Sequence, residues 1–212
     1  MNYVELHARS AFSFLRGGSF PEQLAEVAAK LEMPAMTLLD RNGVYGVQRF
    51  SVAAREHNVR PIIGCELLME DGAVLPVLVE NRTGYKNLCE LLTKEHLRSE
   101  KGKCAARWNE LSEFAKGLVA LFGSGSTGCQ PVVCGSLPQT CNETPRAWRN
   151  CVRQAAGRDR LAACAPRNAE NRTRFLVDTF GRENMFVEIQ RHFIRGEERV
   201  NRELIDLAGA HR

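Results

Sequence analysis

The feature that most constrains the fold is an alternation of short apolar runs and helical patterns along residues 1–122. Continuous apolar runs of about four to eight residues are typical of buried strands, and apolar side chains three or four residues apart are typical of helices that face a core. Apolar strands that alternate with helices indicate an α/β protein with a mainly parallel sheet, either open or closed into a barrel. The predicted strands are 3–7, 34–39, 61–66, 74–79 and 117–122, and later helices are predicted at 47–56, 85–94 and 108–115.

Two local signals predict where elements begin. Ser19 is followed three residues later by Glu22, which predicts a capping box in which Ser19 caps a helix that continues to Leu31. The Asp71-Gly72 pair predicts a tight turn before the strand at 74–79. That strand is then either one arm of a hairpin or part of an edge pair.

Residues 123–167 break this pattern. They open with a Gly- and Ser-rich stretch, hold four of the eight prolines and five of the eight cysteines, and show no sustained period. They also carry six arginines, no lysine and two acidic residues, so this segment accounts for the +4 net charge of the whole chain. Regular patterns resume after this segment and predict a helix at 168–180, a strand at 185–190 and a helix at 197–210. We therefore expect three parts: the first part of an α/β domain at 1–122, a low-order Cys/Arg-rich insertion at 123–167, and the rest of the domain at 168–212.

The insertion allows three interpretations. Zinc binding is disfavoured because the cysteine spacings include no Cys-x-x-Cys and no histidine lies between Cys129 and Cys164. The arginines and Trp148 could contact DNA, although lysines and an amphipathic period are absent. We favour a non-structural insertion in a surface loop, because the entropy of loop closure grows slowly with loop length.

The composition also bears on the cellular compartment. The sequence has no stretch of about eighteen apolar residues, as a membrane helix needs, and its N-terminus lacks the basic-then-apolar order of a secretion signal. We therefore expect a cytoplasmic protein with no membrane partner. A chain of 212 residues with 44% hydrophobic content can bury a core without disulfides, so the eight cysteines are interpreted as reduced thiols.

Polar residues stand at the ends of three predicted strands. His7 and Arg9 follow the first strand, Asp40 and Arg41 follow the second, and Glu66 closes the third. Because ligands bind at the carboxyl ends of strands in such folds, these side chains could converge on one site. An imidazole with two carboxylates would suit a metal ion. The alternative, a hydrogen-bonded structural histidine, remains open on spacing alone.

Four separated segments carry a family resemblance: 6–17 (LHARSAFSFLRG), 39–46 (LDRNGVYG), 63–66 (IGCE) and 80–89 (ENRTGYKNLC), with further support at 180–192. In content and order they resemble the N-terminal polymerase-and-histidinol-phosphatase (PHP) domain of bacterial C-family DNA polymerases. Within that family they look most like the error-prone branch of DNA polymerase III alpha subunits. The resemblance implies an incomplete PHP-type (β/α) barrel with a long irregular insertion, truncated before barrel closure.

The resemblance implies a metal site whose ligand positions are partly replaced. His7, Asp40 and Glu66 stand at positions where metal-binding members have ligands, so they are the candidate, vestigial metal residues. Three further ligand positions, two histidines and one aspartate in the family, are substituted here by Arg9, Arg16 and Arg41. Arginine keeps its positive charge and only donates hydrogen bonds, so it cannot bind a cation. We therefore expect the arginines to pair with Asp40 and Glu66 in place of metals; the alternative is that they point to solvent.

The expected function follows from the same resemblance. The full-length family member makes DNA on a template with magnesium during damage-tolerant replication and repair, and its catalytic carboxylates lie in a palm domain that this chain lacks. We therefore expect no catalytic residue and no cofactor in this chain, which would act as a structural scaffold. The expected partners are the remainder of the polymerase chain, DNA through the full-length enzyme, and replication or repair accessory proteins. Two alternatives are a residual metal-dependent phosphoesterase or proofreading nuclease that uses His7, Asp40 and Glu66, and a standalone DNA- or protein-interaction module.

Overall fold

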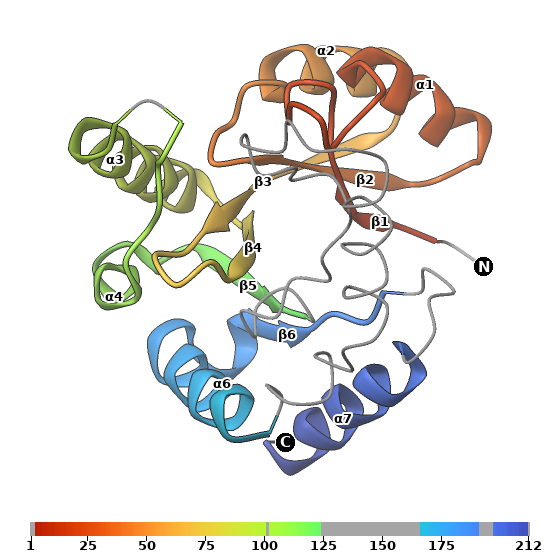
Figure 1. The fold of residues 1–212 in the computed structure, drawn as a ribbon. Helices are drawn as coiled ribbons and strands as arrows, with labels where there is room; N and C mark the ends of the chain where they lie inside the picture. The colour runs from red at the N-terminus through yellow and green to blue at the C-terminus, as the bar shows by residue number, and fades with distance from the viewer. Residues whose placement is uncertain (1–2, 101, 124–165, 191–196, 212) are drawn as a thin grey trace, which may run out of the picture.

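The structure is a computed structural model that describes residues 3–100, 102–123, 166–190 and 197–211. Six strands form one sheet in chain order, and the sheet curls so that its two outer strands turn toward each other (Figure 1). The strands are β1 Glu5–Ala8, β2 Ala35–Arg41, β3 Arg60–Leu68, β4 Val74–Val79, β5 Leu118–Phe122 and β6 Met185–Val187. This is an α/β half-barrel, as the sequence predicts.

The sheet is mixed. Strands β1, β2 and β3 run parallel, and so do β5 and β6, whereas β4 runs antiparallel to both β3 and β5. The predicted hairpin is therefore present, because β3 and β4 are joined by the Asp71-Gly72 turn. In that turn Gly72 has a φ of +84°, a conformation that glycine adopts without strain. The edge-pair alternative is wrong, because β4 lies inside the sheet.

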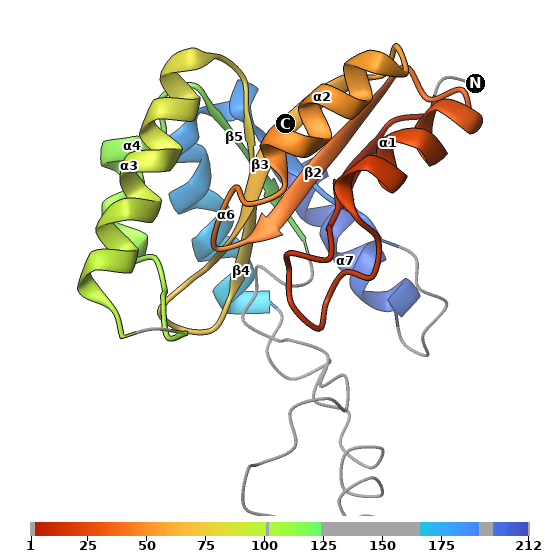
Figure 2. The ribbon, with the colours of Figure 1, turned by 90° about the horizontal axis from the view of Figure 1, so that it is seen from above.

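Helices cover the outside of the curled sheet (Figures 1 and 2). Helices α1 and α2 lie side by side along β2, α3 and α4 flank β4 and β5, and α6 and α7 lie near β6. A 3-10 turn at Trp108–Glu110 precedes α4, and another at Arg182–Asn184 precedes β6. The helices are α1 Pro21–Lys30, α2 Val47–Glu56, α3 Arg82–Arg98, α4 Leu111–Phe114, α6 Pro166–Phe180 and α7 Glu197–Ala210.

The apolar core forms two clusters. The smaller one packs α1 and α2 against β2, with Phe50 and Leu38 fully buried. The larger one packs α3, α4, α6 and α7 against the β3–β5 part of the sheet, with Leu75 and Leu88 fully buried. Each such side chain contributes about 1.5–3 kcal/mol through its removal from water. The core thus lies between the sheet and its outer helices, and the strand ends are left to polar side chains.

The capping box predicted at Ser19 is wrong. The N-cap of α1 is Phe20, whose backbone N–H donates to Oε1 of Gln23 over 2.9 Å. Pro21 occupies the first helical position, where a fixed φ and a missing N–H favour helix initiation. The proline therefore sets the start of the helix one residue later than the serine signal indicated.

The predicted insertion lies almost wholly outside the described residues, which resume at Pro166 after Gly123. Pro166 and Arg167, the first two residues described after Gly123, already belong to α6. The division into 1–122, 123–167 and 168–212 stays a prediction, as do the three interpretations of the insertion. Among the described residues, no helix combines the length and the apolar character needed to cross a membrane.

Candidate functional site

The centre of the candidate site is the side chain of Glu66, which is fully buried. Glu66 lies on β3 directly beside Arg41 of the parallel strand β2. Its Oε2 accepts from Nε of Arg41 over 3.0 Å, and its Oε1 accepts from Nε of Arg9 over 2.6 Å. A terminal nitrogen of Arg9 also contacts Oε1. Two arginines thus hold one buried carboxylate from either side.

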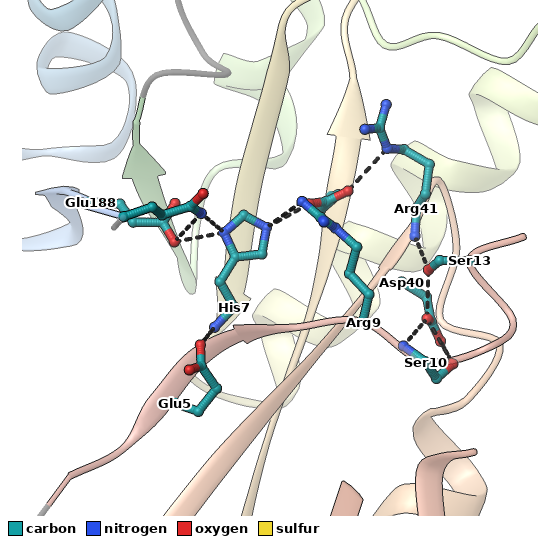
Figure 3. A network of polar contacts seen from close by, with 10 residues as sticks. Glu5, His7, Arg9, Ser10, Ser13, Asp40, Arg41 and Glu188 are labelled. Atoms are coloured by element: carbon teal, nitrogen blue, oxygen red, sulfur yellow. Dashed lines mark hydrogen bonds and ion pairs between the residues drawn. The ribbon is translucent and has the colours of Figure 1, made fainter. Parts of the chain in front are cut away.

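His7 supplies a third positive group. Its Nε2 lies 2.5 Å from Oε1 of Glu66, and its Nδ1 lies 2.6 Å from Oε1 of Glu188, the residue after β6. The amide of Gln190 donates to the same Glu188 oxygen over 2.9 Å. Because His7 is on β1, the imidazole joins the first strand of the sheet to the segment that follows the last one (Figure 3).

These contacts shift the pKa values of His7 and Glu66. Burial lowers the pKa of His7, but its hydrogen bonds to Glu188 and Glu66 outweigh that effect and raise the pKa to about 9. Burial raises the pKa of Glu66, but the contacts with His7 and Arg9 lower it to about 2. At neutral pH the centre therefore contains an imidazolium, two guanidinium groups and a buried carboxylate.

Asp40 is buried in a separate set of contacts. Its Oδ1 accepts from the backbone N–H of Ser10 over 3.0 Å and from the hydroxyl of Ser13 over 2.7 Å. Its Oδ2 accepts from the backbone N–H of Gly46 over 3.0 Å, an approach that a Cβ at this position would crowd, since it would lie 2.8 Å from Oδ2. The hydroxyl of Ser10 donates to the same carboxylate. Asp40 therefore organises the loop after β1.

The expected arginine pairing is right for one carboxylate and wrong for the other. Arg9 and Arg41 pair with Glu66, whereas Asp40 has no arginine contact among the described residues. Serine hydroxyls and backbone N–H groups satisfy Asp40, so it needs no guanidinium. Arg16 is exposed, and the described part of the chain shows no ion pair for it. Of the six candidate positions, the structure joins His7, Arg9, Arg41 and Glu66 directly.

The second carboxylate, Glu188, and the serines that bind Asp40 were not predicted from the sequence. Glu188 lies two residues before the end of the predicted strand 185–190, whereas β6 ends at Val187 in the structure, so only a strand predicted to end there would have made Glu188 a strand-end residue. No comparable signal marked Ser10 and Ser13, because short polar residues in a loop are common.

The sequence of the chain matches a known family of domains. The model of the PHP domain matches residues 5–192, and the chain therefore belongs to the PHP family. It is homologous to the N-terminal region of error-prone DNA polymerases. One such polymerase, from Mycolicibacterium paratuberculosis, is 35% identical over 201 residues, 90% of this chain and 16% of that protein. Another, from Mycobacterium bovis, is 34% identical over 217 residues, 97% of this chain and 17% of that protein. The chain thus spans about a sixth of the length of these relatives.

One solved structure is similar to part of this chain. It is titled a putative metal-dependent phosphoesterase from Bifidobacterium adolescentis, and it is 17% identical to this chain with a TM-score of 0.36. The match covers 44% of this chain and 33% of the phosphoesterase.

Proposed function

We propose that this chain is the PHP portion of an error-prone DNA polymerase and that it acts as a metal-free scaffold for the rest of that protein. The observation that carries the proposal is the convergence of His7, Arg9 and Arg41 on the buried carboxylate of Glu66. By the family resemblance, these fixed positive charges stand at or beside the ligand positions of metal-binding members. DNA synthesis, its magnesium and its accessory proteins belong, in this proposal, to the whole polymerase.

The donor chemistry supports a metal-free centre. Arg9 and Arg41 carry permanent charge and offer no lone pair. Both ring nitrogens of His7 lie within hydrogen-bond distance of carboxylates, Nε2 of Glu66 and Nδ1 of Glu188. The residues present therefore do not fit a metal ion. Across the described ranges, no group of three or more histidine, cysteine, aspartate or glutamate side chains could hold one.

The same chemistry disfavours the phosphoesterase alternative. Metal-dependent hydrolysis needs a cation that lowers the pKa of a bound water, or a base that takes up its proton. Both ring nitrogens of His7 already contact carboxylates, and Glu66 is shielded from solvent by the groups that bind it. A scaffold needs neither function. It needs a centre that ties β1, β2 and β3 to the segment after β6, and the contacts of His7 and Glu66 provide this link.

Metal analysis of the full chain tests the proposal. The wild-type protein is incubated with zinc, manganese and iron(II), dialysed, and analysed by mass spectrometry for each element. A matched variant carries Arg9→His, Arg16→Asp and Arg41→His, which returns the three substituted positions to the ligand types that the family resemblance implies. We expect far less than one metal ion per wild-type chain and a clear gain of bound metal in the variant.

Near-stoichiometric metal in the dialysed wild type would overturn the proposal. Circular dichroism of both proteins shows whether the variant is folded. If the variant is not folded, the single variant Arg9→His is used in its place. It changes only the contacts that Arg9 makes with Glu66 and leaves Arg41 bound to that carboxylate.

A further inference from the structure

A second buried carboxyl group, that of Glu95, lies outside the charged centre. Glu95 is in the last turn of α3, and its side chain is fully buried. Its Oε2 accepts a hydrogen bond from Sγ of Cys104 over 3.4 Å, and its Oε1 has no hydrogen-bond partner among the described residues. Burial removes the water that would stabilise a negative charge, so such a carboxyl group is far easier to keep protonated than ionised.

The cations on the same helix are bound elsewhere. Arg98 donates to Glu110 and to a backbone carbonyl, and the ring of His96 lies 2.9 Å from another backbone carbonyl. In the described part of the chain, Glu95 therefore has no cation in hydrogen-bond contact. Burial is the largest effect on its pKa and raises it to about 7. Four elements supply the charged or titratable groups around Glu95: Cys104 after α3, Cys65 on β3, Glu110 in the 3-10 turn before α4, and His96 and Arg98 on α3 itself.

The segment 102–106, which follows α3, carries Cys104 and is held at several points. The Cys104 thiol donates to Glu95, and its backbone carbonyl accepts from Nδ2 of Asn42 over 2.8 Å. The backbone N–H of Ala106 donates to the carbonyl of Leu68, the last residue of β3, over 2.7 Å. The Cys104 side chain is buried, and burial raises the pKa of its thiol to about 12. In this closed arrangement the thiol is both hidden and neutral.

Ionisation of Glu95 opposes the closed arrangement. The pKa of Glu95 is about 7 in the fold and 4.5 for an exposed glutamate, so the closed segment binds the proton more tightly than an open one. The resulting stabilisation is complete below about pH 4.5 and is lost as the pH rises through 7. A local opening of the segment would admit water to the ionised carboxylate, and openings of this kind cost less than global unfolding.

We propose that the contact between Glu95 and Cys104 is a pH-sensitive switch, in which loss of the Glu95 proton opens the segment 102–106 and exposes the Cys104 thiol. Opening also removes the carbonyl to which Asn42 donates. Because Asn42 directly follows Arg41, the switch extends to the turn beside the charged centre. This inference goes beyond the scaffold role and does not depend on whether the centre binds metal.

Alkylation of the full 212-residue chain tests the switch. Iodoacetamide is added to the folded protein at pH values from 6 to 8, and the modification of each cysteine is measured by mass spectrometry after digestion. Cys89, a partly exposed thiol on α3, is the internal reference. The ratio of the Cys104 rate to the Cys89 rate corrects for the general increase of thiolate with pH. From the two pKa values of Glu95, we expect this ratio to rise about tenfold between pH 6 and 8.

Two variants show whether Glu95 causes the rise. Glu95→Gln keeps the shape of the side chain but cannot lose a proton, so its ratio should stay constant. The control Glu113→Gln removes an exposed carboxylate from α4 and should keep the tenfold rise of the wild type. If circular dichroism shows that Glu95→Gln is not folded, Glu95→Met, which also cannot ionise, takes its place. A constant ratio in the wild type, an equal rise in the Glu95 variant, or loss of the rise in Glu113→Gln would each overturn the inference.

Discussion

Replacement of the buried carboxylate by an amide, Glu66→Gln, is the sharpest test of the charged centre. The neutral amide leaves His7, Arg9 and Arg41 without their shared negative charge in a buried position. Loss of one side of a buried ion pair costs about 3–5 kcal/mol. The pKa of Glu66, held near 2 instead of 4.5, independently corresponds to about 3 kcal/mol of stabilisation of its ionised form. We therefore expect the free energy of unfolding to fall by about 3 kcal/mol.

Urea denaturation at pH 7, followed by circular dichroism, measures this loss. The matched control is Glu26→Gln, which removes a carboxylate from the exposed pair with Lys30 and should leave the free energy of unfolding nearly unchanged. The double variant Arg9→Gln with Glu66→Gln should be more stable than Glu66→Gln alone, because it has one unpaired cation fewer. A loss of less than about 1 kcal/mol in Glu66→Gln, or no gain in the double variant, would refute the reasoning.

Two further predictions concern other parts of the fold. Burial raises the pKa of Glu95 from 4.5 to about 7, so the folded chain binds this proton more tightly than the unfolded chain. Its contribution to the free energy of unfolding should therefore decrease by up to about 3 kcal/mol as the pH rises from about 4.5 through 7. Glu95→Gln should remove this decrease in urea titrations across that range, and an unchanged slope would contradict the assignment. Leu15 has a φ of 60° and is 92% exposed, so Leu15→Gly should raise the unfolding free energy by about 1 kcal/mol. Leu97→Gly, at an exposed position in the last turn of α3, should lower it, and the same sign in both variants would argue against strain at Leu15.

The elements that the sequence predicts well are those with strong local patterns. Helix α2 and strand β4 have the predicted bounds, because an amphipathic period marks the first and a short apolar run between turn residues marks the second. The direction of β4 was indicated only by the Asp71-Gly72 turn before it, as one of two alternatives, and not by the strand's own residues. Strand direction depends on which neighbours pair with the strand, and the apolar run of 74–79 fits a parallel or an antiparallel partner equally well.

The candidate site could be predicted only in part. The strand-end rule identified His7 and Glu66, and the chemistry of arginine indicated that Arg9 and Arg41 would pair with a carboxylate. The choice of Glu66 over Asp40 depended on Ser10 and Ser13, whose hydroxyls reach Asp40 through the fold of one loop. The carboxylate on the other side of His7 is 181 residues away in the chain. Local sequence patterns carry no information about such a contact.

The contact of His7 with Glu188 has a consequence for biosynthesis. At about 5–20 residues per second, a ribosome needs roughly ten to forty seconds to extend the chain from His7 to Glu188. During that interval β1, β2 and β3 are already available to pair. The imidazole of His7 still lacks its second carboxylate, so the outer edge of β1, which pairs with no strand among the described residues, is not yet linked to the segment after β6. An open strand edge is a template for pairing with other chains. The joining of the two sheet edges is therefore a late event, and the nascent chain is most exposed to misassociation before it occurs.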